Sequence, residues 1–251
     1  MWSGGKDSYL ACQETILKGF VVSSLINFKW KNVGKNRLYK VSGLINFLLK
    51  KFSRPTLYKY VPHEINPEII ATQAQAMEIP IVQLEVTWGT YEAQFKTTIR
   101  KLEPTVVEGV VWGAEANQAG SHSYWLHQLC DALGVKTIMP LRGRSEEQNL
   151  ADFVEKGYEA IIIVVDSDLL SEEWLGRKVD HNFLNEIRRL SRERGIPVTG
   201  CFNTLVTDAP LFKKRLKVLK SRKVSKHGYS VLDISKVELV EKTGICKDEN
   251  S

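Results

Sequence analysis

The sequence lacks the features of membrane proteins, secreted disulfide-rich proteins and zinc fingers. No apolar run approaches the ~18–20 residues that a membrane-spanning helix needs, and the first residues carry no secretory signal pattern. The four cysteines, Cys12, Cys130, Cys201 and Cys246, form no CxxC pair, and the five histidines show no metal-binding spacing. We therefore expect a cytoplasmic protein with reduced thiols and no metal-ligand cluster.

Acidic residues are missing from two stretches of the chain, although the formal net charge is only +6. Residues 29–62 contain nine basic side chains and residues 213–226 contain eight, and neither stretch contains an acid. Such stretches could contact a nucleic acid or a ribonucleoprotein. No known nucleic-acid-binding motif accompanies them, so a solvated loop or strand face is the favoured interpretation and direct nucleic-acid binding is the alternative.

The composition is that of a soluble globular chain. Hydrophobic residues make up 43% and charged residues 25% of the 251 residues, which excludes a disordered protein. At roughly 150 residues per domain, this length suggests one large domain or two unequal ones. We expect a first domain over residues 1–140, a second lobe over 141–243 and a polar tail over 244–251.

Helix and strand patterns alternate along most of the chain. The strand segments are continuous apolar runs, as parallel strands buried on both faces require, and this predicts an α/β fold with a doubly wound parallel sheet. After about residue 200 the pattern becomes strand-rich, which predicts a smaller C-terminal α+β lobe with antiparallel pairing. The predicted helices are 7–18, 66–78, 90–102, 122–133, 146–156 and 181–194, and the predicted strands are 21–28, 80–86, 106–113, 135–141, 158–166 and 196–200.

The strongest chemical motif opens the first predicted helix. Its two glycines allow a tight turn that brings backbone N–H groups close to a ligand, and the helix start adds a partial positive charge. A lysine and two hydroxyl groups complete a pocket for phosphate or pyrophosphate, while the Walker pattern GxxxxGK[ST] is absent. The alternative is a glycine turn that merely caps a helix. The motif consists of Ser3, Gly4, Gly5, Lys6, Asp7 and Ser8.

This hexapeptide resembles the PP-loop of the ATP pyrophosphatases in the adenine nucleotide alpha-hydrolase superfamily. Members of that group cleave ATP between the α and β phosphates, transfer AMP to a substrate oxygen and release pyrophosphate. The resemblance implies ATP and Mg²⁺ as cofactors, with the loop 3–8 holding pyrophosphate, Lys6 and Asp7 acting in catalysis, and Asn27 and Phe28 facing the adenine. Gly113, which ends a predicted strand, is a further candidate nucleotide-binding residue.

Further blocks of sequence are similar to the diphthine–ammonia ligase family. The resemblance implies a ligase that adenylates the carboxylate of diphthine on elongation factor 2 and forms diphthamide with ammonium. A non-catalytic ATP-binding protein of the translation apparatus, or a related enzyme with another acceptor, is the alternative. The blocks are residues 71–82, 106–113, 133–141, 173–177 and 204–212.

The sequence departs from that family in three places, of which two are the more consequential. The family has a buried strand before the loop, whereas only Met1 and Trp2 precede it here. Since that strand positions the loop in such folds, we expect the natural start to lie upstream. The family also carries an acidic, glycine-rich stretch where this chain has residues 200–204 without a glutamate. Asn203 and Thr204 remain as candidate catalytic residues, and Cys201 is interpreted as a packed thiol.

Several other residues are weaker candidates. Arg177 in the block 173–177 is a candidate catalytic residue that would contact a phosphate or the substrate carboxylate, and a structural ion pair with Asp180 or Glu173 is the alternative. Glu115 is a candidate replacement for a family carboxylate, with a solvated loop glutamate as the alternative. His63 is a weak site candidate, and a helix-entry residue is the favoured interpretation. Asp208 and Pro210 are expected to shape a turn.

Overall fold

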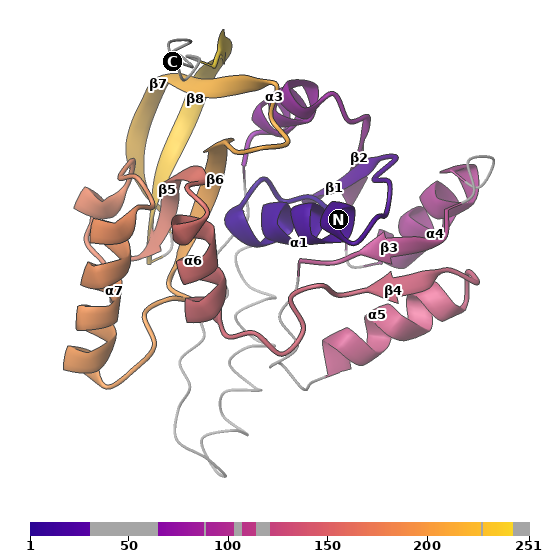
Figure 1. Cartoon of the computed structure of the whole chain (residues 1–251), viewed down its shortest axis with the longest axis horizontal. Coiled ribbons are helices and arrows are strands. Elements are labelled where there is room, and N and C mark those ends of the chain that lie inside the picture. The colour runs from indigo at the N-terminus through magenta and orange to yellow at the C-terminus, as the bar shows by residue number, and fades with distance from the viewer. Residues whose placement is uncertain (31–64, 88, 103–106, 114–120, 227, 243–251) are drawn as a thin grey trace, which may run out of the picture.

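The computed structural model describes residues 1–30, 65–87, 89–102, 107–113, 121–226 and 228–242 (Figure 1). All six predicted helices are present, with bounds that differ from the predicted ones by a few residues at most. None of the helices in these ranges is long and apolar enough to cross a membrane. The helices are α1 (Lys6–Leu17), α3 (Pro67–Met77), α4 (Tyr91–Leu102), α5 (Ser121–Asp131), α6 (Glu146–Glu155) and α7 (His181–Arg194).

Parallel pairing is confirmed for the first four strands, which form two separate pairs. Strand β1 (Leu25–Trp30) pairs with β2 (Ile81–Val86), and β3 (Gly109–Val111) pairs with β4 (Lys136–Ile138). The first two residues of the chain lie between these pairs. The Trp2 N–H donates to the Ile26 carbonyl of β1 at 2.8 Å, and the amino group of Met1 donates to the Val111 carbonyl of β3. The additional upstream strand stays a prediction.

The C-terminal strands form one antiparallel sheet, as expected for residues after 200. Its order is β6-β5-β8-β7, with β5 (Glu159–Asp166), β6 (Phe202–Asp208), β7 (Lys214–Lys226) and β8 (Tyr229–Glu241). The prediction of a parallel strand over 158–166 is wrong, because β5 pairs antiparallel with both β6 and β8. Its apolar run reflects burial on both faces: Ile162 belongs to one core cluster and Ile163 to another. Continuous burial, rather than parallel pairing, explains the pattern.

The predicted strand over 196–200 is also wrong. This segment is a turn, in which the Val198 N–H donates to the Ser191 hydroxyl at 3.0 Å and the Cys201 N–H donates to the Val198 carbonyl at 3.1 Å. Pro197 has no N–H to contribute to a ladder. Local hydrogen bonds therefore replace the strand pairing that the apolar residues suggested.

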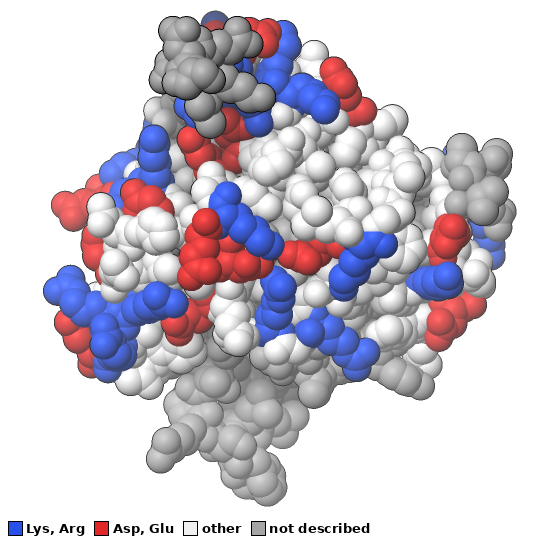
Figure 2. All heavy atoms as spheres, in the orientation of Figure 1, with Lys and Arg blue, Asp and Glu red and all other residues white. Residues whose placement is uncertain are grey.

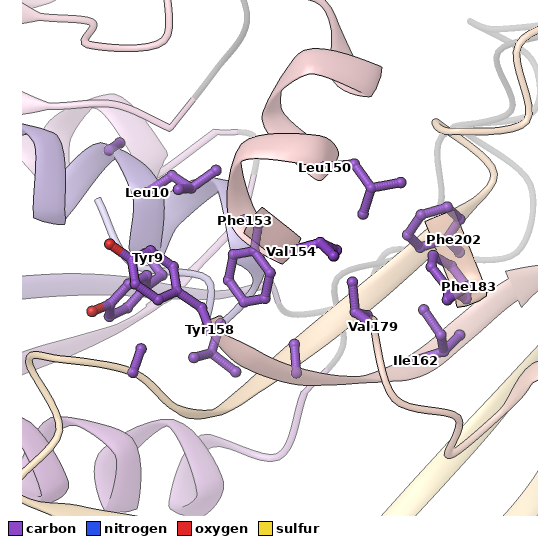
Figure 3. Close-up of a cluster of buried hydrophobic side chains, with 14 of the residues drawn as sticks. Tyr9, Leu10, Leu150, Phe153, Val154, Tyr158, Ile162, Val179, Phe183 and Phe202 are labelled. Atoms are coloured by element: carbon purple, nitrogen blue, oxygen red, sulfur yellow. The ribbon is translucent and has the colours of Figure 1, made fainter. Parts of the chain in front are cut away.

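The largest core cluster joins helices and strands from both ends of the chain. Figure 3 shows Tyr9 and Leu10 of α1 at one end of this cluster, near Phe153 of α6 and Tyr158, with Phe183 of α7 and Phe202 of β6 at the other end. The Tyr9 ring packs edge-on against Tyr158 with centroids 5.2 Å apart. Because this core contains residues from either side of position 140, α1 and the loop before it rest directly on the C-terminal elements; the domain division at 140 stays a prediction.

The basic stretch 213–226 forms the edge strand β7, in agreement with the interpretation as a solvated face. Lys214, Lys217 and Arg222 pair across to Glu241, Glu238 and Asp233 of β8, with N–O distances of 2.7, 3.4 and 2.8 Å. Charged side chains on an edge strand discourage pairing with other chains. On the face drawn in Figure 2, blue and red side chains are interspersed. Nearly all of the other basic stretch, 29–62, lies outside the described residues.

Candidate functional site

The turn before α1 has room for glycine alone at one position. Gly4 has φ +81°, a left-handed conformation that favours glycine. A Cβ atom there would lie 2.5 Å from Cδ1 of Ile70 and 2.6 Å from Oε1 of Gln73. The Gly4 carbonyl accepts the Val206 N–H at 2.9 Å. The loop is thus tightly packed against α3 and joined to β6.

The start of α1 offers backbone donors. Gly5 is the residue directly before the helix, and it has no side chain that could accept a hydrogen bond from the first helical N–H groups. The Lys6 N–H donates to Oγ1 of Thr204 at 2.9 Å, whereas no hydrogen bond from the N–H of Asp7 or Ser8 is found to any described residue. Unpaired N–H groups and the helix dipole together favour an anion at this end.

The side chains of the loop form a compact polar cluster. The Lys6 ammonium lies 2.7 Å from Oδ1 of Asp7, and the Lys6 side chain is only 7% exposed. The Ser8 hydroxyl donates to the Gly5 carbonyl at 2.9 Å, and the Ser3 hydroxyl donates to the Ser8 hydroxyl at 3.1 Å. A buried lysine and unpaired N–H groups in the same helix turn are an arrangement that can bind a phosphate or pyrophosphate.

The structure brings Thr204 to the loop and places Asn203 elsewhere. Thr204 is buried, its hydroxyl accepts the Lys6 N–H, and its carbonyl lies 3.1 Å from where a Cβ of Gly5 would be. Side chains alternate along β6, so Asn203 lies on the opposite face of the strand. Of the two candidates in the stretch 200–204, Thr204 is the one that contacts the loop.

Gly113 and Asn27 also adjoin the loop. A Cβ on Gly113 would lie 3.0 Å from the Asp7 carbonyl and from the Ser8 nitrogen, so glycine lets the end of β3 approach the first turn of α1. The Asn27 side-chain amide donates to the Trp2 carbonyl at 3.0 Å, one residue before the loop. Both predicted residues are therefore neighbours of the motif.

Phe28 belongs to an aromatic cluster at the carboxyl end of β1. Its ring centroid lies 4.4 Å from that of Tyr91, and Tyr91 stacks on Trp30 at 5.3 Å. Trp125 of α5 extends the cluster, at 5.4 Å from Tyr91. Ligands of parallel sheets bind beyond the carboxyl ends of the strands, which is where this cluster lies.

Arg177 is engaged away from the loop. It makes two hydrogen bonds to Glu186, at 3.0 and 2.7 Å, and its guanidinium carbon lies 4.2 Å from the centroid of the Trp174 ring. The hydrogen bonds to Glu186 raise the pKa of Arg177. A structural ion pair is therefore present, but with Glu186 rather than with the expected Asp180 or Glu173.

Four weaker candidates from the sequence remain: Cys201, Asp208, Glu115 and His63. Cys201 is a buried free thiol, as its interpretation as a packed thiol predicts, and burial raises its pKa to about 11. Asp208 forms ion pairs with Arg215 and Lys242, at 3.3 and 2.7 Å. Glu115 and His63 lie outside the described residues.

Two polar residues at the site escaped the sequence reasoning. Gln73 of α3 is fully buried and hydrogen-bonded to the loop. Glu146, in the first turn of α6, has a pKa raised chiefly by burial and interacts electrostatically with Lys6 and Asp7. The Thr199 hydroxyl hydrogen-bonds to Glu146, whose Oε2 is buried without a hydrogen-bond partner among the described residues. A glutamine inside an otherwise apolar helix face was the available signal for Gln73. Glu146 had no comparable signal, because acidic residues are common in the first turn of any helix.

The described residues contain no group of three or more His, Cys, Asp or Glu side chains that could hold a metal ion. Magnesium commonly binds through one or two carboxylates together with substrate phosphates. The Asp7 carboxylate is 37% exposed within the glycine loop, where it pairs with Lys6, and it fits the role of one such carboxylate for a magnesium ion that is carried by a nucleotide.

Comparison with known protein families identifies two adjoining domains. Residues 40–137 match the diphthamide synthase N-terminal domain, and residues 145–240 match the diphthamide synthase C-terminal domain. A diphthine–ammonia ligase of Schizosaccharomyces pombe is 31% identical over 105 residues. This match covers 41% of the present chain and 17% of the relative, so the chain corresponds to a small part of that protein. The chain belongs to the diphthamide synthase family.

Proposed function

We propose that the protein is an ATP-dependent, amide-forming ligase of diphthamide biosynthesis. It adenylates a carboxylate, releases pyrophosphate and transfers ammonia, and diphthine on elongation factor 2 is the substrate that the family suggests. The observation that carries this proposal is the glycine loop at the start of α1, where a buried lysine paired with Asp7 and the unpaired N–H groups of Asp7 and Ser8 belong to one helix turn.

Lys6 and the backbone of α1 stabilise the departing pyrophosphate. Negative charge accumulates on the β phosphate as the bond to the α phosphate breaks, and fixed donors lower the energy of that state without a proton transfer. The Lys6 ammonium, now 2.7 Å from Asp7, would shift its contact toward the phosphate. The hydroxyl groups of Ser3 and Ser8 supply further donors at the same place.

The nucleoside end of ATP extends toward β1 and β3. Phe28 and the rings beside it offer an apolar surface for adenine, and Asn27 holds the chain just before the loop. Gly113 lets the segment after β3 pack closely against the first turn of α1, which positions that turn for the phosphates. Magnesium, when bound, neutralises phosphate charge, with Asp7 as the residue that would hold it.

Residues 200–204 contribute a hydrogen-bonding group rather than a charge. Thr204 orients the Lys6 N–H, whereas Asn203 brings no carboxylate to the loop. The missing glutamates support a second candidate function: an ATP-binding family member without ligase activity that associates with the translation apparatus. Arg177 is proposed to stabilise the C-terminal lobe, since Glu186 already occupies its guanidinium.

The test is formation of AMP and pyrophosphate from ATP, ammonium and diphthine-containing elongation factor 2. Lys6→Ala should abolish the reaction, whereas Lys18→Ala, a change of the same kind beyond the last residue of α1, should leave it unchanged. ATP binding without pyrophosphate release would support the second candidate. Release that Lys6→Ala does not reduce would refute the proposed role of the loop.

A further inference from the structure

The side-chain amide of Gln73 is buried, and both its oxygen and its nitrogen have hydrogen-bond partners. The residue is 0% exposed on α3. Its Oε1 accepts the Trp2 indole N–H at 3.1 Å, and its Nε2 donates to the carbonyls of Gly4 at 3.0 Å and Val206 at 2.7 Å. An indole can only donate and carbonyls can only accept, so these partners fix the orientation of the amide.

These hydrogen bonds fix the peptide that leads into the loop. The Gly4 carbonyl accepts from Gln73 and from the Val206 N–H. Because a peptide unit is planar, holding the Gly4 carbonyl also fixes the direction of the Gly5 N–H. The left-handed backbone of Gly4 is thereby locked at the point where the chain turns into α1.

The same side chain connects the loop to β6. Gln73 holds the carbonyl of Val206, and Thr204, two residues earlier on the same face of β6, accepts the Lys6 N–H. The Gln73 amide therefore affects both places where β6 contacts the helix start, namely the hydrogen bond at the Gly4 carbonyl and the one from the Lys6 N–H. Loss of a buried hydrogen-bond partner leaves carbonyls unsatisfied and weakens the whole network.

We propose that Gln73 is a positioning residue of the phosphate site: without touching the ligand, it fixes the Gly4–Gly5 peptide that leads into the helix start and holds the part of β6 that carries Thr204. This inference rests on the proposed function for its ligand, pyrophosphate. It predicts that changing Gln73 loosens the loop and weakens pyrophosphate binding more than it weakens the fold.

The test compares Gln73→Met with Gln13→Met. Gln13 is also a buried glutamine, on α1, and accepts a hydrogen bond from the Tyr9 hydroxyl at 3.0 Å. Both variants exchange an amide for an apolar side chain of similar length, but only Gln73 contacts the loop. Hydrogen exchange measured by mass spectrometry on residues 3–8 and 204–206 reports loop order, and calorimetry with inorganic pyrophosphate reports affinity.

We expect exchange in both segments to increase at least tenfold, and pyrophosphate affinity to fall at least tenfold, in Gln73→Met relative to Gln13→Met. Unchanged exchange would overturn the inference even if the wild-type protein binds pyrophosphate. Faster exchange with unchanged affinity would overturn it as well. Faster exchange in a protein whose wild type binds neither pyrophosphate nor ATP would support Gln73 as the loop anchor and refute the proposed function instead.

Discussion

The two halves of this protein are built differently, and the candidate site lies where they meet. The N-terminal half has two short parallel pairs, β1–β2 and β3–β4, with Met1 and Trp2 between them. The C-terminal half has one continuous antiparallel sheet with two 13-residue strands. The loop before α1 belongs to the first half in sequence but is held by β6 of the second.

This difference teaches that the loop 3–8, the proposed phosphate site, is not a self-contained motif. Its donors come from α1, whereas its shape depends on Thr204, Val206 and the buried Gln73. The C-terminal sheet should therefore affect nucleotide binding without touching the nucleotide. Four substitutions, taken in order of decreasing effect, can break or sharpen this comparison.

Gly4→Ala should lower the free energy of unfolding the most, because Gly4 lies where the loop packs against α3 and β6. Left-handed backbone costs a residue with a Cβ atom about 1–2 kcal/mol, and overpacking against Ile70 and Gln73 adds about 1–3 kcal/mol. Gly134→Ala is the matched control, since Gly134 has φ +69° but nothing within 4 Å of its would-be Cβ. Urea unfolding measures both. Equal losses in the two variants would show that the loop is not tightly packed.

Thr204→Val tests whether β6 supports the helix start. The change keeps the shape of the side chain but leaves the buried Lys6 N–H without its acceptor, which should cost about 1–2 kcal/mol and weaken pyrophosphate binding. Thr207→Val, on the opposite face of the same strand, is the control. If both variants bind pyrophosphate like the wild type, the halves are independent at this point.

Glu146→Gln tests the electrostatics on the side of α6. Burial raises the pKa of Glu146, so the folded protein binds a proton more readily than the unfolded chain does. Ionisation therefore lowers stability as pH rises above the ordinary glutamate range. The variant should melt higher than the wild type at pH 7 and equally at pH 4. A melting difference that is the same at both pH values would contradict the assignment.

Arg177→Met should have the smallest effect on the site. Its pair with Glu186 is about one-third exposed on both sides, and such pairs contribute about 1 kcal/mol or less. We expect slightly lower stability and unchanged pyrophosphate affinity. Arg188→Met, which removes a pair with Glu147, is a matched control. A loss of pyrophosphate binding in Arg177→Met but not in Arg188→Met would show that Arg177 takes part in ligand binding after all.

The helices and the loop could be predicted from sequence because their signals are local. The apolar periodicity of residues 181–194 and the glycine that follows them predict the bounds of α7. The residues of the motif 3–8 themselves indicate which groups can donate hydrogen bonds at the start of α1. The pairing of β5 could not be predicted, since burial on both faces looks the same in parallel and antiparallel sheets. Gln73 and Glu146 depend on contacts between distant segments, which no local pattern records.

The most direct measurement is calorimetric titration of inorganic pyrophosphate and ATP into the folded protein and its Lys6→Ala variant. The account predicts saturable binding of both ligands to the wild type and at least tenfold weaker binding to the variant, because one buried ammonium and the N–H groups of α1 hold the phosphates. A folded wild-type protein with no affinity for either ligand, or equal affinity in both proteins, would contradict it.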